Sequence, residues 1–427
     1  MTGQLGQVIV NVVDNLMVGR LGAADLAAVS LAVSMCIVFI IVGLGISFAL
    51  PPLLARSDGA GQHNRVGLYF YHSLIINIIY ALSCLIIIEL LVPLIPYLGH
   101  DPIVVEKAIP YIHITAITMI PLMLFQSLRC FADGLSRTKL PMVAIIIGNI
   151  ANIALNYMLI FGKWGAPSLG VTGAALGTLI ARMLMIIVLL FLIFKQTNLG
   201  SYLKSKSLKL RKRIFQNLLD IGVPTSLQMF FEVSGFAGAA LLMGMIGKDA
   251  QAGHQIAINM SAVTFLICSG LGMAATVRVG NKLGEKNALG MRTAGISAIL
   301  QVVAIMFICA LIFILFRSIL PTFYIDDINV IEIASILLIA AAAFQIPDGV
   351  QVVAIGALRG IQDVKIPTAI TFFAYWIIGL PVSYLATFYF DFGPLGIWAG
   401  LVMGLSISSI LLTIRFLNKT KTKLEVI

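Results

Sequence analysis

The sequence predicts an all-α polytopic membrane protein with twelve transmembrane helices in two six-helix lobes. Hydrophobic residues fill 60% of the 427 positions and charged residues only 11%, whereas soluble domains carry roughly 25% charge. Apolar stretches of about 18 or more residues, each long enough to cross a bilayer, recur from end to end. The alternating pattern of a β-barrel is absent, and similar motifs recur in the same order in the two halves.

The apolar stretches predict twelve membrane spans joined by mostly short polar connections. The spans are residues 1–19, 27–53, 68–95, 107–131, 140–161, 169–194, 214–246, 251–279, 293–320, 333–358, 366–390 and 394–417. One longer polar run, "KQTNLGSYLKSKSLKLRKR" at residues 195–213, is basic. We expect it to be a cytoplasmic linker between an N-terminal lobe, residues 1–194, and a C-terminal lobe, residues 214–427.

The basic residues indicate the orientation of the spans. Most of the 28 Lys and Arg residues lie in every second connection and in the C-terminal tail. Basic loops remain in the cytoplasm, so we expect a multi-pass protein of the plasma (inner) membrane with both termini cytoplasmic. The net charge of +10 then marks topology and contact with anionic lipids, and we expect no nucleic-acid partner.

Four pairs of similar motifs indicate an internal duplication at nearly one offset. The pairs are residues 18–28 with 243–253, 43–67 with 270–290, 133–141 with 359–367, and 169–174 with 395–400. Each copy holds an even number of spans, so the lobes share one orientation and are related by a pseudo-two-fold axis along the membrane normal. The counterpart of residues 211–226 would precede Met1, so the first span looks clipped.

Ionisable side chains inside a bilayer cost about 2.5–3.5 kcal/mol each on insertion scales and by default mark function. Asp14, Glu232 and Asp348 are the acids nearest to the middle of a span. Glu89 lies closer to the end of its span, and we expect an interfacial or locally paired carboxylate there. Arg182 is the one basic residue of this kind, and we expect it to pair with a carboxylate or with backbone carbonyls.

Polar side chains repeat at helical spacing around the acids and on two further spans. These stripes are Thr225, Gln228 and Glu232; Gln251, Gln255 and Asn259; Gln345, Asp348 and Gln351; and Asn149, Asn152 and Asn156. One such stripe would simply bond one helix to another. Four stripes, two of which contain an acid, favour a polar cavity instead.

The motifs of several other protein classes are missing from the sequence. There is no P-loop, no dinucleotide fingerprint in a βαβ context, no HExxH and no nucleophile elbow. The five cysteines are scattered over apolar segments without a CxxC pair, so we expect no disulfide and no cysteine-bound metal. A membrane-embedded transferase would need paired Asp motifs or His clusters, and we expect no enzyme, no nucleotide and no organic cofactor.

Motifs over nearly the whole chain resemble the multidrug and toxic compound extrusion (MATE) transporters, most closely the NorM-like branch. They are "VDNLMVGRLGAADLAAVS" at 13–30, "FFEVSGF" at 230–236, "AGHQIAINMS" at 252–261, "RVGNKLGE" at 278–285 and "PDGVQVVAIGALRGIQD" at 347–363. The resemblance implies export of cationic amphipathic compounds by alternating access, in exchange for sodium ions or protons.

The resemblance also implies particular site residues. Asp14 matches the acid of an N-lobe cation site, which Asn152, Asn156 and Thr178 would complete, and Glu232 and Asp348 match C-lobe acids; sodium would bind at either group. The complete set of expected cavity residues is Asp14, Asn152, Asn156, Thr178, Gln228, Glu232, Gln255, Asn259, Phe265, Asp348 and Gln351. Phe265 stands where the family can carry a tyrosine, which weakens the case for a C-lobe sodium site.

The chemistry of a buried carboxylate agrees with this reading. Such a group resists ionisation, and it holds either a proton or a cation but not both comfortably. The partners expected are small cationic organic compounds and membrane lipids, and the protein is expected to be a monomer. A flippase for lipid-linked precursors from the same superfamily is the alternative, but such proteins tend to carry basic cavity residues, and here the candidates are acidic except for Arg182.

Overall fold

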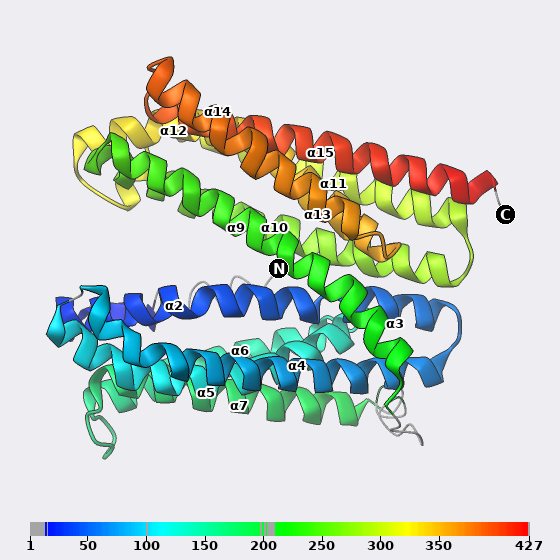
Figure 1. Cartoon of the computed structure of the whole chain (residues 1–427), viewed down its shortest axis with the longest axis horizontal. Helices are drawn as coiled ribbons and strands as arrows, with labels where there is room; N and C mark the ends of the chain where they lie inside the picture. The colour runs from blue at the N-terminus through cyan, green and yellow to red at the C-terminus, as the bar shows by residue number, and fades with distance from the viewer. Residues whose placement is uncertain are drawn as a thin grey trace. The chain divides into compact units, whose positions relative to one another are not determined.

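The computed structural model describes residues 13–14, 16–99, 101–196, 199, 202 and 210–425. Within these ranges every regular element is a helix and no strand occurs, as the sequence predicts. Figure 1 shows the helices of each part running side by side.

The helices of the first half lie before residue 196. They are α2 (Ala23–Ser47), α3 (Leu50–Gly59), α4 (His63–Leu91), the 3₁₀ segment η1 (Val92–Leu98), α5 (Pro102–Gly134), α6 (Lys139–Phe161) and α7 (Gly170–Lys195).

The helices of the second half begin at Lys212. They are α9 (Lys212–Ile246), α10 (Lys248–Gly284), α11 (Ala288–Leu315), η2 (Leu320–Phe323), α12 (Ile328–Gly360), α13 (Lys365–Phe372), η3 (Phe373–Gly379), α14 (Leu380–Tyr384), η4 (Leu385–Tyr389) and α15 (Pro394–Glu425).

Eleven segments of the described chain are helical, long and apolar enough to cross a membrane. They are Ala23–Gly59, His63–Tyr97, Pro102–Gly134, Lys139–Phe161, Gly170–Lys195, Lys212–Ile246, Lys248–Gly284, Ala288–Leu315, Ile328–Gly360, Lys365–Tyr389 and Pro394–Lys421. Each contains most of one predicted span, from the second to the twelfth, so these eleven predictions are confirmed. The first predicted span, 1–19, lies mostly outside the described residues, although positions 13–14 and 16–19 are helical.

The chain folds into two compact units. Unit 1 comprises the described parts of Met1–Leu54 and Gln62–Ser226, and unit 2 comprises Ala55–Gly61 and Leu227–Ile427. Most of the predicted linker, 195–213, lies outside the described residues. The boundaries of the two predicted lobes, and the two-fold axis between them, therefore stay predictions.

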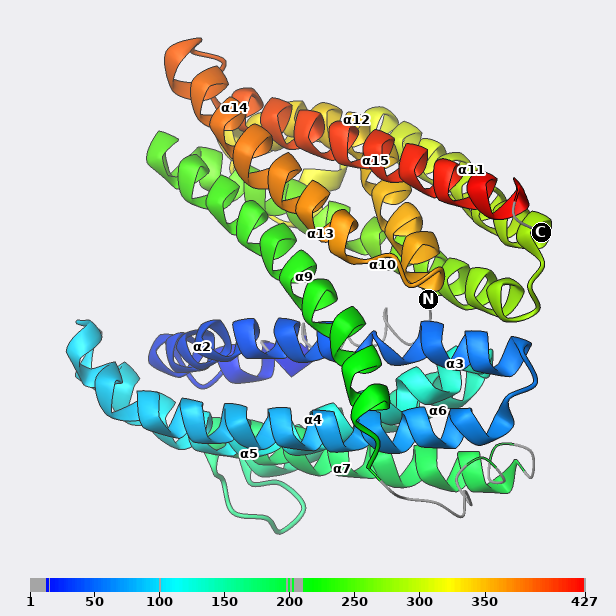
Figure 2. The same ribbon diagram turned by 45° about the vertical axis from the view of Figure 1, so that its right-hand side comes forward.

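Small side chains allow close helix packing in unit 1. Ala28 and Ala32 on α2 are fully buried in one cluster with Ala108 and Ile112 of α5, and Figure 2 shows α4, α5 and α7 lying side by side. Such contacts suit a membrane, where helix association depends on packing and interhelical hydrogen bonds.

The first half of α9 belongs to unit 1, where two hydrogen bonds from the helix and one from the residue before it hold it. Ser226 Oγ donates to the Val42 carbonyl at 2.8 Å, and Asn217 Nδ2 donates to the Tyr69 hydroxyl at 3.1 Å. The Arg211 amide donates to Nε2 of the fully buried His72 at 2.8 Å. The second half of the same helix, from Leu227, belongs to unit 2.

Helix α12 lies at the centre of unit 2, in contact with α10, α11 and α15. A side chain at Gly356 would collide with the backbone of Gly272 on α10, so glycine is required for this approach. The Thr276 hydroxyl uses the same contact and donates to the Gly356 carbonyl at 2.8 Å.

Glycines on α15 allow the backbone of the span Lys365–Tyr389 to pack closely against this helix. Gly396, Gly400 and Gly404 repeat every four residues, and a Cβ on each would meet Thr387, Ser383 and the Ala374 carbonyl respectively. The facing span contains two π-helical stretches, η3 and η4; such stretches are rare and are frequent at functional sites. The stripe therefore fixes an irregular helix closely against α15.

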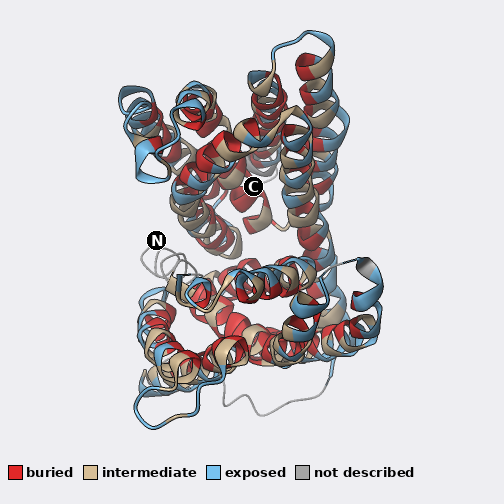
Figure 3. Ribbon diagram, turned by 90° about the vertical axis from the view of Figure 1, so that its left-hand side faces the viewer, coloured by how far each residue is buried: buried red, intermediate tan, exposed pale blue. Residues whose placement is uncertain are grey.

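The burial pattern suits a membrane environment. In Figure 3 buried residues face inward within each unit and exposed residues line the outside. The exposed positions include large apolar side chains such as Leu90, Phe191 and Leu241, whereas the residues fully buried inside include Ser47 and Asn77, bonded to each other at 2.7 Å. Apolar surface outside and polar pairs inside are the arrangement that lipid requires.

Replacing Gly400 by Ala should destabilise unit 2, because the new Cβ would collide with Ser383 and with the Gly379 carbonyl. Overpacking of this kind costs about 1–3 kcal/mol, and for a unit of this size each kcal/mol lowers the melting temperature by about 2–4 °C. Thermal unfolding in detergent, followed by tryptophan fluorescence, measures the effect.

The matched control is Ala399→Val, which adds more volume at the adjacent exposed position of α15. We expect little change for this control. Equal melting temperatures for Gly400→Ala and the unsubstituted protein would show that the contact has room to spare.

Candidate functional site

Four of the predicted residues meet in unit 1. Asn156 Nδ2 on α6 donates to Asp14 Oδ1 at 2.7 Å and lies 3.4 Å from Asn152 Oδ1. Asn152 Nδ2 in turn donates to Thr178 Oγ1 on α7 at 3.3 Å. Three separate segments of the chain thus join in one continuous chain of hydrogen bonds that ends at a carboxylate.

A glycine on α7 makes this junction possible. A Cβ at Gly177 would collide with Asn156 Oδ1, so α7 can approach α6 only without a side chain there. One turn earlier, a Cβ at Gly173 would meet the Leu159 carbonyl at 2.6 Å. Gly173 and Gly177 form a GxxxG motif, which fits any close helix contact. Here it lets α7 approach α6 closely enough for Asn152 to donate to Thr178.

Two ionisable side chains that the predicted cavity set omits lie next to this cluster. Arg182, four residues after Thr178 on α7, interacts electrostatically with Asp14. Tyr111 on α5 interacts electrostatically with both of them. The prediction that Arg182 pairs with a carboxylate or with backbone carbonyls stays a prediction, because no hydrogen bond or ion pair of its guanidinium is seen among the described residues; no feature of the sequence singles out Tyr111.

Glu232 and Asp348 form the second group of acids, in unit 2. Glu232 lies on α9 and Asp348 on α12, where only 2% of its surface is exposed. The two interact electrostatically, but in the described part of the chain neither carboxylate accepts a hydrogen bond or forms an ion pair. Buried charges are normally paired, so the position of Asp348 is unusual and costly, whereas the half-buried Glu232 also interacts electrostatically with Arg359.

Two predicted residues bond to the irregular span beside the acids. Gln351 Nε2 donates to the Tyr375 hydroxyl at 3.0 Å, and Gln228 Nε2 donates to Thr371 Oγ1 at 3.3 Å. Tyr375, in the π-helical stretch η3, is 2% exposed and interacts electrostatically with both Glu232 and Asp348. Thr371 and Tyr375 are spaced by four, the same polar spacing as the predicted stripes, and that spacing is the signal that could have found them.

Buried polar atoms without a hydrogen-bond partner occur on the same helix as Asp348. Gln345 is fully buried one turn before Asp348, and neither atom of its amide finds a hydrogen-bond partner in the described structure; the same holds for Gln351 Oε1. Buried polar atoms are almost always bonded to protein, water or a ligand. These atoms therefore suit a hydrated or ion-holding site.

Gln255, Asn259 and Phe265 are less closely associated with the acids. Gln255 is exposed on α10 and donates to Asn259 Oδ1 at 3.2 Å, and Phe265 is half-buried on the same helix. Within the described residues no hydrogen bond joins any of the three to Glu232 or Asp348. Their membership of the cavity stays a prediction.

Glu89 is locally paired, as the sequence predicts. Its Oε2 lies 2.7 Å from Nδ1 of His113, with 38% and 43% of the two side chains exposed. The pair links the last turn of α4 to α5. All five cysteines are free, and in the described residues no three His, Cys, Asp or Glu side chains gather in a metal-binding group.

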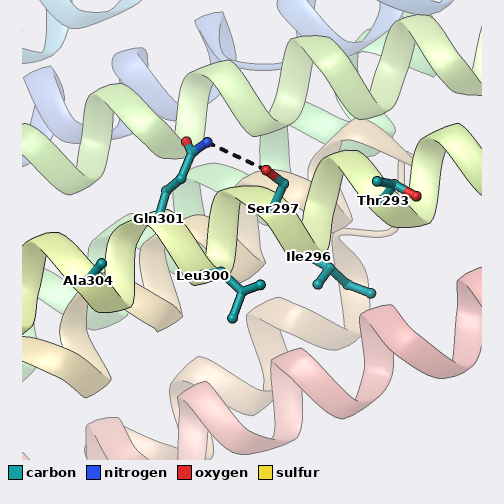
Figure 4. A pocket seen from close by; sticks show the side chains of 6 residues that line it. All are labelled: Thr293, Ile296, Ser297, Leu300, Gln301 and Ala304. Atoms are coloured by element: carbon teal, nitrogen blue, oxygen red, sulfur yellow. Dashed lines mark hydrogen bonds between the residues drawn. The ribbon is translucent and has the colours of Figure 1, made fainter.

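A hollow of about 560 Å³ lies elsewhere on unit 2, along one face of α11. Figure 4 shows its six lining residues, Thr293, Ile296, Ser297, Leu300, Gln301 and Ala304. Gln301 Nε2 approaches Ser297 Oγ at 3.5 Å. The lining includes none of the candidate site residues, so the chemistry of the acids does not involve this hollow.

Comparison with known proteins adds a family. The family model described as MatE matches residues 1–158 and 224–385. "Multidrug resistance protein NorM" of Photobacterium profundum is 36% identical over 408 residues, covering 94% of this chain and 90% of that protein. "Multidrug resistance protein MdtK" of Proteus mirabilis is 36% identical over 429 residues, covering 96% and 92%.

Solved structures agree in fold. The crystal structure of MATE in the straight conformation superimposes with a TM-score of 0.91 and 20% identity, covering 100% of this chain and 94% of that one. A MOP superfamily transporter from Pyrococcus furiosus gives a TM-score of 0.88 at 21% identity, covering 99% and 94%. At this level of identity the likeness establishes the fold.

The close contact of α6 with α7 predicts a specific coupling. Gly177→Ala should cost about 1–3 kcal/mol of stability, because Asn156 must turn away from the new Cβ and so leave Asp14. In an Asn156→Ala background the obstructing oxygen is gone, so the same substitution should cost much less. Thermal unfolding of both single variants and the double variant measures this interaction, which we expect to reach about 0.5–3 kcal/mol.

Gly19→Ala is the control for the added methyl group, since nothing lies within 4 Å of its Cβ. Strictly additive losses at positions 156 and 177 would rule out the proposed steric link.

Proposed function

Because the chain belongs to the multidrug and toxic compound extrusion (MatE) family, we propose that it exports cationic amphipathic compounds in exchange for protons or sodium ions. Eleven candidate spans and the family make it an integral, multi-pass membrane protein. The two relatives described above carry the name multidrug resistance protein. The observation that carries the proposal is the pair of acids, half-buried Glu232 and buried Asp348, which have no hydrogen-bond or ion-pair partner in the described residues.

The carboxylate pair provides the exchange. Burial disfavours the charged form of a carboxyl group, and a second negative charge nearby disfavours it further. A proton or a cation that enters the site removes this cost, and the two compete because each neutralises the same charge. If the site opens alternately to the two faces of the membrane, inward movement of the coupling ion drives the substrate out. One inward charge contributes about 2.3 kcal/mol per 100 mV.

Aromatic rings beside the acids suit an apolar cation. Phe236 packs against Tyr375 and Phe344, with ring centroids 5.7 and 5.9 Å apart. Phe231 packs against Phe372 at 4.9 Å on the same side of the unit. The face of an aromatic ring attracts cations, and a flat apolar wall accepts compounds of varied shape. These features support an amphipathic substrate with a positive charge.

The proposed function also implies a topology, a coupling ion and an oligomeric state. We place both termini in the cytoplasm of a cell whose plasma (inner) membrane holds the protein, because connections rich in Lys and Arg alternate with connections that contain few of them. The coupling ion is the only cofactor we propose, and a monomer is sufficient because each candidate group of acids lies within one unit of one chain.

Glu232→Gln and Asp348→Asn should each reduce the export of a fluorescent cation such as ethidium by at least about tenfold, the scale of losing about 1.4 kcal/mol of interaction. The amides keep the shape of the side chains but can neither release a proton nor attract a cation. Export from proteoliposomes that contain the purified protein, driven by an imposed ion gradient, gives the measurement.

Glu106→Gln is the matched control, because it removes the same charge from an exposed position on α5. We expect unaltered export for it. Full, ion-dependent export by both Glu232→Gln and Asp348→Asn would overturn the proposed mechanism.

Imposing a pH gradient and a sodium gradient separately should show whether protons or sodium ions drive export. We expect the unsubstituted protein to respond to at least one gradient in the direction that draws the ion inward. If neither gradient drives export of any organic cation and labelled lipid-linked precursors cross the bilayer instead, the alternative flippase function is correct.

A further inference from the structure

The last turn of α3 lies directly against the last turn of α10. Residues Ala55–Gly61, which include that turn, belong to unit 2 together with α10, whereas the first half of α3 belongs to unit 1. A Cβ at Gly59 would collide with the carbonyl oxygen of Asn281, and a Cβ at Gly284 would collide with that of Arg56. At each glycine, backbone therefore meets backbone, and these four residues form a glycine crossing between the two helices.

The glycine crossing is reciprocal, and its two sides correspond in the two similar halves of the sequence. Gly284 follows Gly59 by 225 positions, and Asn281 follows Arg56 by the same number (284 minus 59 and 281 minus 56). The first pair of similar motifs in the sequence has the same offset. Each half thus presents its glycine to the residue three places before the glycine of the other half. This reciprocity indicates that the repeated scaffold itself builds the contact.

Polar side chains at the glycine crossing are only partly satisfied. Arg56 Nη1 donates to Gln362 Oε1, in the connection that follows α12, at 3.0 Å and in an exposed position. The buried atoms Asn281 Oδ1 and Gln362 Nε2 have no hydrogen-bond partner in the described part of the chain. A buried polar atom without a partner destabilises the arrangement that buries it. The closed crossing therefore carries a cost that would disappear if the helix ends parted and water reached both atoms.

The helix ends that cross lead into connections expected in the cytoplasm. α3 ends at Gly59 and α10 at Gly284, and the connections that follow are two of those in which Lys and Arg residues gather. Basic connections remain in the cytoplasm, so we expect the glycine crossing at the cytoplasmic end of both helices. A transporter that exposes its site to each face of the membrane in turn has to open and close this end.

We propose that the glycine crossing is a latch, a contact that closes the cytoplasmic end of the transport path and parts once in each cycle. The inference rests on the proposed antiport, which supplies the need to open this end. At the glycines the two backbones meet without interlocking side chains, so the helix ends can part without repacking a core. Opening also brings water to Asn281 Oδ1 and Gln362 Nε2, which offsets the contacts that are lost.

The attachment of α9 to unit 1 is of a different kind. It includes the hydrogen bond from Ser226 Oγ to the Val42 carbonyl at 2.8 Å and a bond to the fully buried His72. Breaking such bonds leaves buried polar groups unpaired, whereas the exposed bond between Arg56 and Gln362 exchanges for bonds to water at little cost. We therefore expect the first half of α9 to stay in place while the glycine crossing parts.

Cross-linking across the latch tests whether it has to part. The double variant Arg56→Cys, Gln362→Cys places thiols where the two side chains meet, and a short bifunctional methanethiosulfonate joins them in proteoliposomes. Cross-linked protein should export ethidium about tenfold more slowly or worse, because a blocked conformational step limits turnover. Reduction of the link should restore export. Each single-cysteine variant, treated with the same reagent, is the control for the five native cysteines and should export normally.

Added methyl groups test the closeness of the glycine crossing without requiring transport. In the double-cysteine protein, Gly59→Ala and Gly284→Ala should each slow cross-linking by about tenfold, because the new Cβ collides with the opposite backbone and forces the helix ends apart. Gly19→Ala is the control, since nothing lies within 4 Å of its Cβ, and it should leave the cross-linking rate unchanged. Size-exclusion chromatography identifies folded variants.

Three results would overturn the proposal: thiols that do not cross-link, full export by the cross-linked protein, or unchanged cross-linking rates in folded Gly59→Ala and Gly284→Ala variants. If both alanine variants fail to fold, export by the cross-linked protein decides. Failure of the antiport itself would appear separately, as an unsubstituted protein that exports no organic cation under any gradient, although the alanine substitutions still slow cross-linking.

Discussion

Hydrocarbon offers no hydrogen-bonding partner, and the placement of polar groups in both units follows from this constraint. Most hydroxyls donate to a carbonyl of their own helix, as Thr118 does to Ile114 at 2.6 Å and Ser127 to Met123 at 3.1 Å. The carboxylates of Glu232 and Asp348, and the guanidinium of Arg182, depart from this rule among the described residues. Other buried polar atoms also lack a partner, among them atoms of Gln345, Trp398 and Ser408, so the acids are set apart by their charge and not by the missing partner alone.

Glycines help to satisfy the same constraint, because they let helix backbones approach each other closely. Gly177 lets Asn156 reach Asp14, and Gly400 lets Ser383 bond to the Ile397 carbonyl at 2.9 Å. In each case a missing Cβ brings two helices close enough for polar groups to meet. The sites are therefore consequences of helix packing and cannot be separated from it.

Much of the fold is readable from the sequence, because an apolar run of sufficient length has one stable conformation in lipid. The chain of Asp14, Asn152, Asn156 and Thr178 is also predictable, through helical spacing and family resemblance together. The four-residue spacing of Thr371 and Tyr375 could have marked Tyr375 as a candidate, but its hydrogen bond with Gln351 depends on the rotation of one helix against another. Spacing on one helix does not determine that rotation, and it likewise leaves Gln255 without a firm place.

The π-helical stretches of the eleventh predicted span have a consequence for how this chain can change over time. A π turn holds one residue more than an α turn, so deletion of one residue from η3 would let the helix tighten and continue across the bilayer. The rest of the span would keep its orientation, because the π turn accommodates its extra residue locally, but residues within the stretch, Tyr375 among them, would face in new directions. Substitutions in this segment are therefore easier to accommodate than changes in its length, and its residue count is itself an inherited structural feature.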